Sequence, residues 1–136
     1  MLKTYAVLIG RLIFAGMFGM ALAFKVSGIN ATASYIAAAG LPFPLVLAVL
    51  AAVFEFGLVI AFLTGAFFTE AALAAVAYVL FLGFMFHGPS HWSANQDEFG
   101  FFMDHFTFAA GLLFAAAHGP GEKFALRRFS FMPATA

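Results

Sequence analysis

Four long apolar stretches, separated by polar or glycine-containing connectors, dominate the pattern along the chain. They cover about residues 5–24, 43–63, 67–87 and 99–118. Each is close to the ~20 residues that a helix needs to cross the ~30 Å hydrocarbon layer of a membrane. Backbone polar groups cannot be left unpaired in lipid, and the stretches lack the alternation of a β-barrel strand. The pattern therefore predicts four transmembrane helices.

The connectors predict how these helices are joined. Residues 31–39 form a shorter segment that favours an interfacial helix, with Tyr35 and Ile36 facing lipid. A tight turn around Gly65 joins the second span to the third. Short joins favour antiparallel neighbours. We expect an all-α membrane protein, an antiparallel four-helix transmembrane bundle with a short interfacial helix between helices 1 and 2, formed by residues 1–136 as a single transmembrane domain.

Composition supports a membrane location and excludes several classes of function. Hydrophobic residues make up 65% of the chain and charged residues 9%, whereas a soluble domain has about 25% charged residues. The formal net charge is zero, so there is no basic field that would attract nucleic acid. The chain has no cysteine, which excludes disulfides, thiolate metal sites and thiol redox chemistry within it.

The distribution of lysine and arginine predicts the orientation. Lys3, Lys123, Arg127 and Arg128 lie near the two ends of the chain. Loops rich in these residues stay on the cytoplasmic side of a membrane. We therefore expect a multi-pass protein of the plasma membrane with both termini in the cytoplasm, and with residues 119–136 as a cytoplasmic tail.

Two charged residues lie deep inside predicted spans. Arg11 and Glu55 fall at similar depths on adjacent antiparallel helices, which predicts an ion pair between them. Such a pair could simply orient the helices, or it could form the floor of a ligand or proton site. In a third interpretation Arg11 reaches a lipid phosphate while Glu55 stays protonated. Tyr78, near mid-depth on the third span, either adds a hydroxyl to this site or only packs.

Histidines and acids gather at the opposite end of the predicted spans from the termini. We call this set the outer polar cluster; it consists of Lys25, His87, His91, Glu98 and Asp104. A solvated loop, a metal site and a proton or ligand site are the three interpretations. Pro89 separates the two loop histidines, and no metal-binding motif is present, so we assign no metal ligand. His105, early in the fourth span, is expected to point inward.

The order of several short segments resembles the DoxX family of bacterial four-helix membrane proteins. The segments that carry the resemblance are Arg11-Leu12-Ile13-Phe14, Lys25, Tyr35, Gly40-Leu41-Pro42-Phe43-Pro44, Glu55, Gly57, Gly65, His87 to Trp92, Ala110-Gly111-Leu112-Leu113 and Gly119-Pro120-Gly121. The chain departs from the family where many members carry Lys-Asn in place of Asp104-His105, and a basic residue in place of Glu70. What the outer polar cluster binds could therefore differ here.

The resemblance implies a redox-linked role in a bacterial plasma (inner) membrane. We expect an accessory subunit in redox or quinone-linked metabolism, with no cofactor held by the chain itself and quinone as a candidate ligand. One alternative is a non-catalytic structural subunit of a larger membrane complex, with other membrane subunits or further copies of the chain as partners. Another is a small-molecule binder with a pocket around Glu55. Whether the chain is an enzyme stays open.

Overall fold

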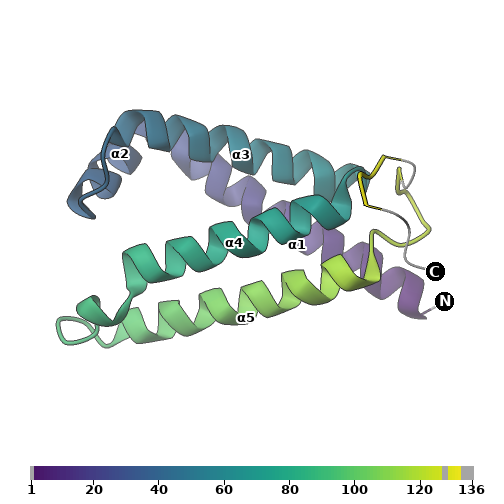
Figure 1. The fold of residues 1–136 in the computed structure, drawn as a ribbon. Coiled ribbons are helices and arrows are strands. Elements are labelled where there is room, and N and C mark those ends of the chain that lie inside the picture. The colour runs from purple at the N-terminus through teal and green to yellow at the C-terminus, as the bar shows by residue number, and fades with distance from the viewer. Residues whose placement is uncertain (1, 127–128, 133–136) are drawn as a thin grey trace. The chain divides into compact units, whose positions relative to one another are not determined.

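The computed structural model describes residues 2–126 and 129–132, without the side chains of Leu2 and Lys3. The described residues form five α-helices and one short 3₁₀ helix: α1 (Leu2–Ser27), α2 (Ile29–Ala38), α3 (Pro44–Thr64), α4 (Phe68–His87), η1 (Pro89–His91) and α5 (Asp97–His118). Four of these, α1, α3, α4 and α5, are long and apolar enough to cross a membrane. The expectation of an all-α protein with four spanning helices and a short helix between the first two is confirmed (Figure 1).

The helices fall into two compact units. The first unit comprises Met1–Ala66 with Pro120–Phe129, and the second comprises Phe67–Gly119 with Ser130–Ala136. Arg127 and Arg128, two of the residues behind the orientation argument, lie outside the described residues, as do the last four positions of the predicted tail.

In the first unit, α1 and α3 lie side by side and run in opposite directions (Figure 1). The Phe62 ring packs against Phe14 and Phe18 of α1, at centroid distances of 5.5 and 5.8 Å. Nearer the other end of the pair, Gly19 lies against Val59. Small and aromatic residues at helical spacing thus bring the two helices close, as is usual where lipid supplies no hydrophobic driving force.

The short helix α2 packs against α3 and, less extensively, against α1. Tyr35 is exposed, but its neighbour Ile36 is buried. The expectation that Ile36 faces lipid is therefore wrong. Consecutive residues on a helix point about 100° apart, so one face of α2 can cover the helix pair while Tyr35 stays on the surface.

The join between α3 and the segment after it depends on Gly65. This residue ends α3 with φ = 75°, a left-handed conformation that costs other residues about 1–2 kcal/mol. A Cβ atom added here would lie 2.8 Å from the Cβ of Ala125. The next residue of that segment, Leu126, donates its backbone N–H to the carbonyl of Thr64 at 2.8 Å. The missing side chain therefore lets the segment after α5 dock on the end of α3.

In the second unit, α4 and α5 form an antiparallel hairpin closed by η1 (Figure 1). Alanines make up much of its buried surface, including Ala72 and Ala75 on α4 and Ala109 on α5. The indole N–H of Trp92 donates to the carbonyl of His87 at 2.9 Å. Because that carbonyl ends α4, Trp92 satisfies one of the backbone groups that a helix end leaves without an internal partner.

Candidate functional site

Arg11 is buried and donates hydrogen bonds only to backbone carbonyls. Its side chain is 1% exposed, and each of its five N–H groups has an acceptor. The acceptors are Phe62 at 3.0 Å, Leu63 at 2.7 Å, Pro120 at 2.9 Å, Lys123 at 3.2 Å and Phe124 at 2.9 Å. We call this arrangement the Arg11 clasp. It joins α1, the end of α3 and the segment after α5 through one side chain.

The expected ion pair between Arg11 and Glu55 is wrong. The carboxylate of Glu55 accepts from the ammonium of Lys25 at 2.8 Å instead. The expectation assumed that the start of α1 and the end of α3 lie at the same face of the membrane. In the structure Phe14 packs against Phe62, two residues before the end of α3. The first part of α1 therefore extends past α3 by about 15 Å, at a rise of ~1.5 Å per residue.

The Lys25–Glu55 pair lies at the far end of α1 from the Arg11 clasp. The Glu55 side chain is 1% exposed and the Lys25 side chain 19% exposed. Sequence reasoning assigned Lys25 to the outer polar cluster and Glu55 to the intramembrane residues, but the structure brings them together. A lysine at the end of one helix can extend its flexible stem to a carboxylate within the next.

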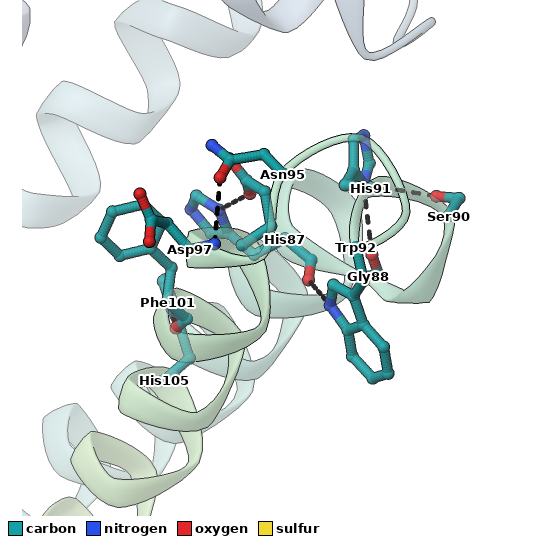
Figure 2. Close-up of polar contacts among 10 residues, drawn as sticks. His87, Gly88, Ser90, His91, Trp92, Asn95, Asp97, Phe101 and His105 are labelled. Carbon is teal, nitrogen blue, oxygen red and sulfur yellow. Dashed lines mark hydrogen bonds and ion pairs between the residues drawn. The ribbon is translucent and has the colours of Figure 1, made fainter.

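His87, Glu98 and His105 form the second group of ionisable residues that the structure brings together. Nδ1 of His87 lies 2.6 Å from Oε2 of Glu98. The ring centroids of His87 and His105 are 5.1 Å apart, and Nδ1 of His105 lies 2.7 Å from the carbonyl of Phe101 (Figure 2). His87 thus contacts both Glu98, another member of the outer polar cluster, and His105 across the α4–α5 hairpin.

The remaining candidates of the second unit are His91, Asp104 and Tyr78. His91 is exposed, and its Nδ1 lies 3.3 Å from the carbonyl of Gly88, on the η1 side of the loop (Figure 2). Asp104 is exposed on α5, and Tyr78 is half-buried on α4. Within residues 2–126 and 129–132, no group of three or more histidine, aspartate or glutamate side chains is arranged to hold a metal ion.

Glu70 is a polar anchor that sequence reasoning missed. Its Oε1 accepts from the Ser130 hydroxyl at 2.7 Å, and from the backbone N–H groups of Phe131 and Met132. In the sequence, Glu70 stands out only as an acid where many family members carry a basic residue. The structure places it in the first turn of α4. Glu70 holds the last described residues of the chain, much as the Arg11 clasp holds residues 120–124.

Comparison with known proteins identifies the family. The family model described as DoxX matches residues 6–88, which is more than half of the chain. This range includes Arg11, Lys25, Glu55 and His87, whereas α5 follows it. Comparisons with curated proteins and with solved structures give no significant match. The chain is an integral membrane protein of four spanning helices, and it belongs to the DoxX family.

Proposed function

We propose that this DoxX protein is an accessory membrane subunit in redox or quinone-linked metabolism, and that Lys25 and Glu55 bind the polar head of its ligand. The observation that carries the proposal is the 2.8 Å ion pair between them within helices built to cross a membrane. Charged groups at membrane depth are costly, and they mark substrate and ion pathways more often than other positions do.

The chemistry of the pair suits a lipid-soluble ligand with a carbonyl head, such as a quinone. An ammonium group carries three N–H donors, and among the described residues one of them goes to Glu55. The 19% exposed fraction of the Lys25 side chain leaves room for a further acceptor. A quinone carbonyl oxygen can accept from Lys25 while Glu55 balances the positive charge. The chain itself then needs no bound cofactor, because the ligand supplies the redox chemistry.

Quinone content tests this proposal directly. The full chain is purified in mild detergent from its native membrane, extracted with organic solvent, and quinone is measured by mass spectrometry per mole of protein. We expect Lys25→Met and Glu55→Gln to lower the quinone content about tenfold, equivalent to about 1.4 kcal/mol of binding. Lys123→Met is the matched control, since it removes a lysine whose ammonium contacts Tyr5 near the start of α1. Equal quinone in all variants would overturn the proposal.

A second candidate function is that of a structural subunit without a ligand, in a complex with other membrane proteins or with copies of itself. The Arg11 clasp favours it, because the most extensive polar arrangement in the first unit is saturated by the chain's own carbonyls. Copurification with large partners in fixed ratio, without quinone, would support this candidate. If the protein instead binds a small molecule without redox chemistry, a ligand other than quinone should copurify with the wild type and be lost in Glu55→Gln.

We further propose a bacterial plasma membrane location with both termini in the cytoplasm. Lys3 and Lys123 near the ends of the chain support this orientation. The chain has no native cysteine, so single cysteines can report sidedness without further changes. In intact cells we expect Ser90→Cys to react with a membrane-impermeant maleimide and Ser130→Cys to be protected. The reverse pattern would contradict the orientation.

A further inference from the structure

Two histidine rings lie side by side where α4 ends and α5 begins. His87 is the last residue of α4, and His105 lies in the third turn of α5. Their ring centroids are 5.1 Å apart and their planes are inclined by 38° (Figure 2). Both belong to the second unit, so the contact is internal to one hairpin.

Hydrogen bonds fix the same tautomer in both rings. Nδ1 of His105 faces the carbonyl of Phe101 at 2.7 Å, and a carbonyl can only accept, so Nδ1 must donate. Nδ1 of His87 faces Oε2 of Glu98 at 2.6 Å, and an ionised carboxylate likewise only accepts. In a neutral imidazole with Nδ1 protonated, Nε2 carries the lone pair. When neutral, each ring therefore has Nε2 as the nitrogen that can bind a metal ion.

This pattern of partners is typical of histidines that bind metal ions. Metal-ligating histidines almost always donate their second ring N–H to a carboxylate or a backbone carbonyl, which fixes the tautomer and raises the basicity of the ligand nitrogen. Here one ring donates to a carboxylate and the other to a carbonyl. The His87 and Glu98 side chains are 20% and 22% exposed, so water and ions can reach the group.

The distance between the two ring centroids is the one that a shared metal ion requires. With metal–nitrogen bonds of about 2.0 Å and tetrahedral angles, two imidazole centroids on one ion lie about 5 Å apart. The observed separation is 5.1 Å. Gly83, one helical turn before His87, allows this approach because a Cβ added there would lie 2.9 Å from the Cβ of His105.

We propose that Nε2 of His87 and Nε2 of His105 bind one divalent late transition metal ion, of the class that prefers imidazole nitrogen, such as Cu²⁺ or Zn²⁺. Glu98 and the Phe101 carbonyl act as positioning partners of the two rings. Because the described residues supply no third ligand of this kind, water or a small anion completes the coordination. The proposal is independent of a ligand at Lys25 and Glu55.

Copper binding to the full, untagged chain in detergent tests the proposal. Cu²⁺ is the suitable probe because nitrogen sites bind it most strongly among the first-row divalent ions. We expect one equivalent in a titration calorimeter, with an electron paramagnetic resonance spectrum that shows two equivalent imidazole nitrogens. His87→Ala and His105→Ala should each weaken binding by at least about tenfold, and Glu98→Gln by about tenfold. Zn²⁺ should compete for the same site.

The chain supplies a matched control in His118. Its Nδ1 also faces the carbonyl four residues earlier, that of Phe114 at 2.9 Å, as Nδ1 of His105 faces Phe101. Removing His118 therefore deletes a histidine with the same local hydrogen bond but outside the paired rings. We expect His118→Ala and His91→Ala to bind copper as the wild type does.

Gly83→Ala sharpens the test without deleting a ligand. The added methyl group should displace His105 and lower copper affinity. The His105→Ala variant keeps the Cβ atom that packs on Gly83, so it should still fold. Circular dichroism and size-exclusion chromatography check folding for every variant. Unchanged copper affinity in folded His87→Ala and His105→Ala would overturn the proposal, and so would a spectrum with a single nitrogen ligand.

Discussion

Two cations on helix α1, Arg11 and Lys25, have surroundings that differ in kind. All five guanidinium N–H groups of Arg11 end on backbone carbonyls, and the side chain is 1% exposed. Lys25 meets one carboxylate, that of Glu55, and its side chain is 19% exposed. Among the described residues, the donors of Arg11 are all paired and Lys25 retains donor capacity.

The comparison shows that depth in the membrane does not by itself mark a functional charge. A buried cation whose donors are all paired stabilises the fold and has nothing left to offer a ligand. A cation with remaining donors and some exposure can bind one. Arg11 and Lys25 therefore differ in whether their hydrogen-bond donors are all paired, and not only in their position along the helix. On this basis we assign a structural role to Arg11 and propose a binding role for Lys25.

Arg11→Gln should have the largest effect on stability. It leaves several carbonyls at the end of α3 and in residues 120–124 without their donors, and we expect a loss of about 3–5 kcal/mol of unfolding free energy. Reversible unfolding in detergent measures it. Arg11→Lys should recover part of the loss, since an ammonium keeps the charge but lacks the planar fork. If the unfolding free energy of Arg11→Gln were within about 0.5 kcal/mol of the wild-type value, Arg11 would not have the structural role that we assign to it.

A double-mutant cycle on Lys25 and Glu55 should give the next largest effect. Lys25→Met leaves the 1% exposed carboxylate without its cation, and we expect a loss of about 2–3 kcal/mol. Glu55→Gln alone should cost a similar amount or less. The double variant Lys25→Met/Glu55→Gln should lie close to wild type, because neither charge is then left buried. Strict additivity of the two losses would show that the pair does not interact.

Gly65→Ala tests how the segment after α5 docks. The left-handed φ of 75° and the 2.8 Å approach to Ala125 lead us to expect a loss of about 1–2 kcal/mol. Gly57→Ala is the matched control on the same helix, since no atom lies within 4 Å of a Cβ added there. It should be neutral or slightly stabilising. Equal effects of the two substitutions would mean that the close approach does not matter.

Glu70→Ala should have the smallest effect, and a local one. Losing Oε1 removes the shared acceptor of Ser130, Phe131 and Met132, so these residues should become accessible while the helices stay folded. Limited chymotrypsin digestion followed by mass spectrometry should show faster cleavage after Phe131. Glu122→Ala, which removes an exposed acid after α5, is the charge-matched control and should be cleaved at the wild-type rate.

The helices could be predicted because the information lies in single segments. Each apolar run is long enough to span, and Gly65 marks a turn by its own conformational freedom. The partners of Arg11 could not be predicted in this way. They are carbonyl groups, which every residue carries, and three of them belong to positions more than a hundred residues away along the chain.

The group of His87, Glu98 and His105 could be predicted from the sequence only in part. The sequence points to His87, Glu98 and His105 because histidines and acids gather at one end of the third and fourth predicted spans. It could not pair them, since pairing depends on the register between α4 and α5. The four-residue spacing of Gly83 and His87 was a usable signal, because a gap beside one histidine on a helix face leaves room for another side chain.

The most direct test compares Arg11→Gln with the double variant Lys25→Met/Glu55→Gln in the same detergent. Both alter charged side chains of the first unit, and thermal unfolding followed by circular dichroism measures both. We expect the arginine variant to melt far below wild type and the double variant to melt close to it. Equal melting temperatures, or a double variant that unfolds first, would contradict the assignment of the two cations to different roles.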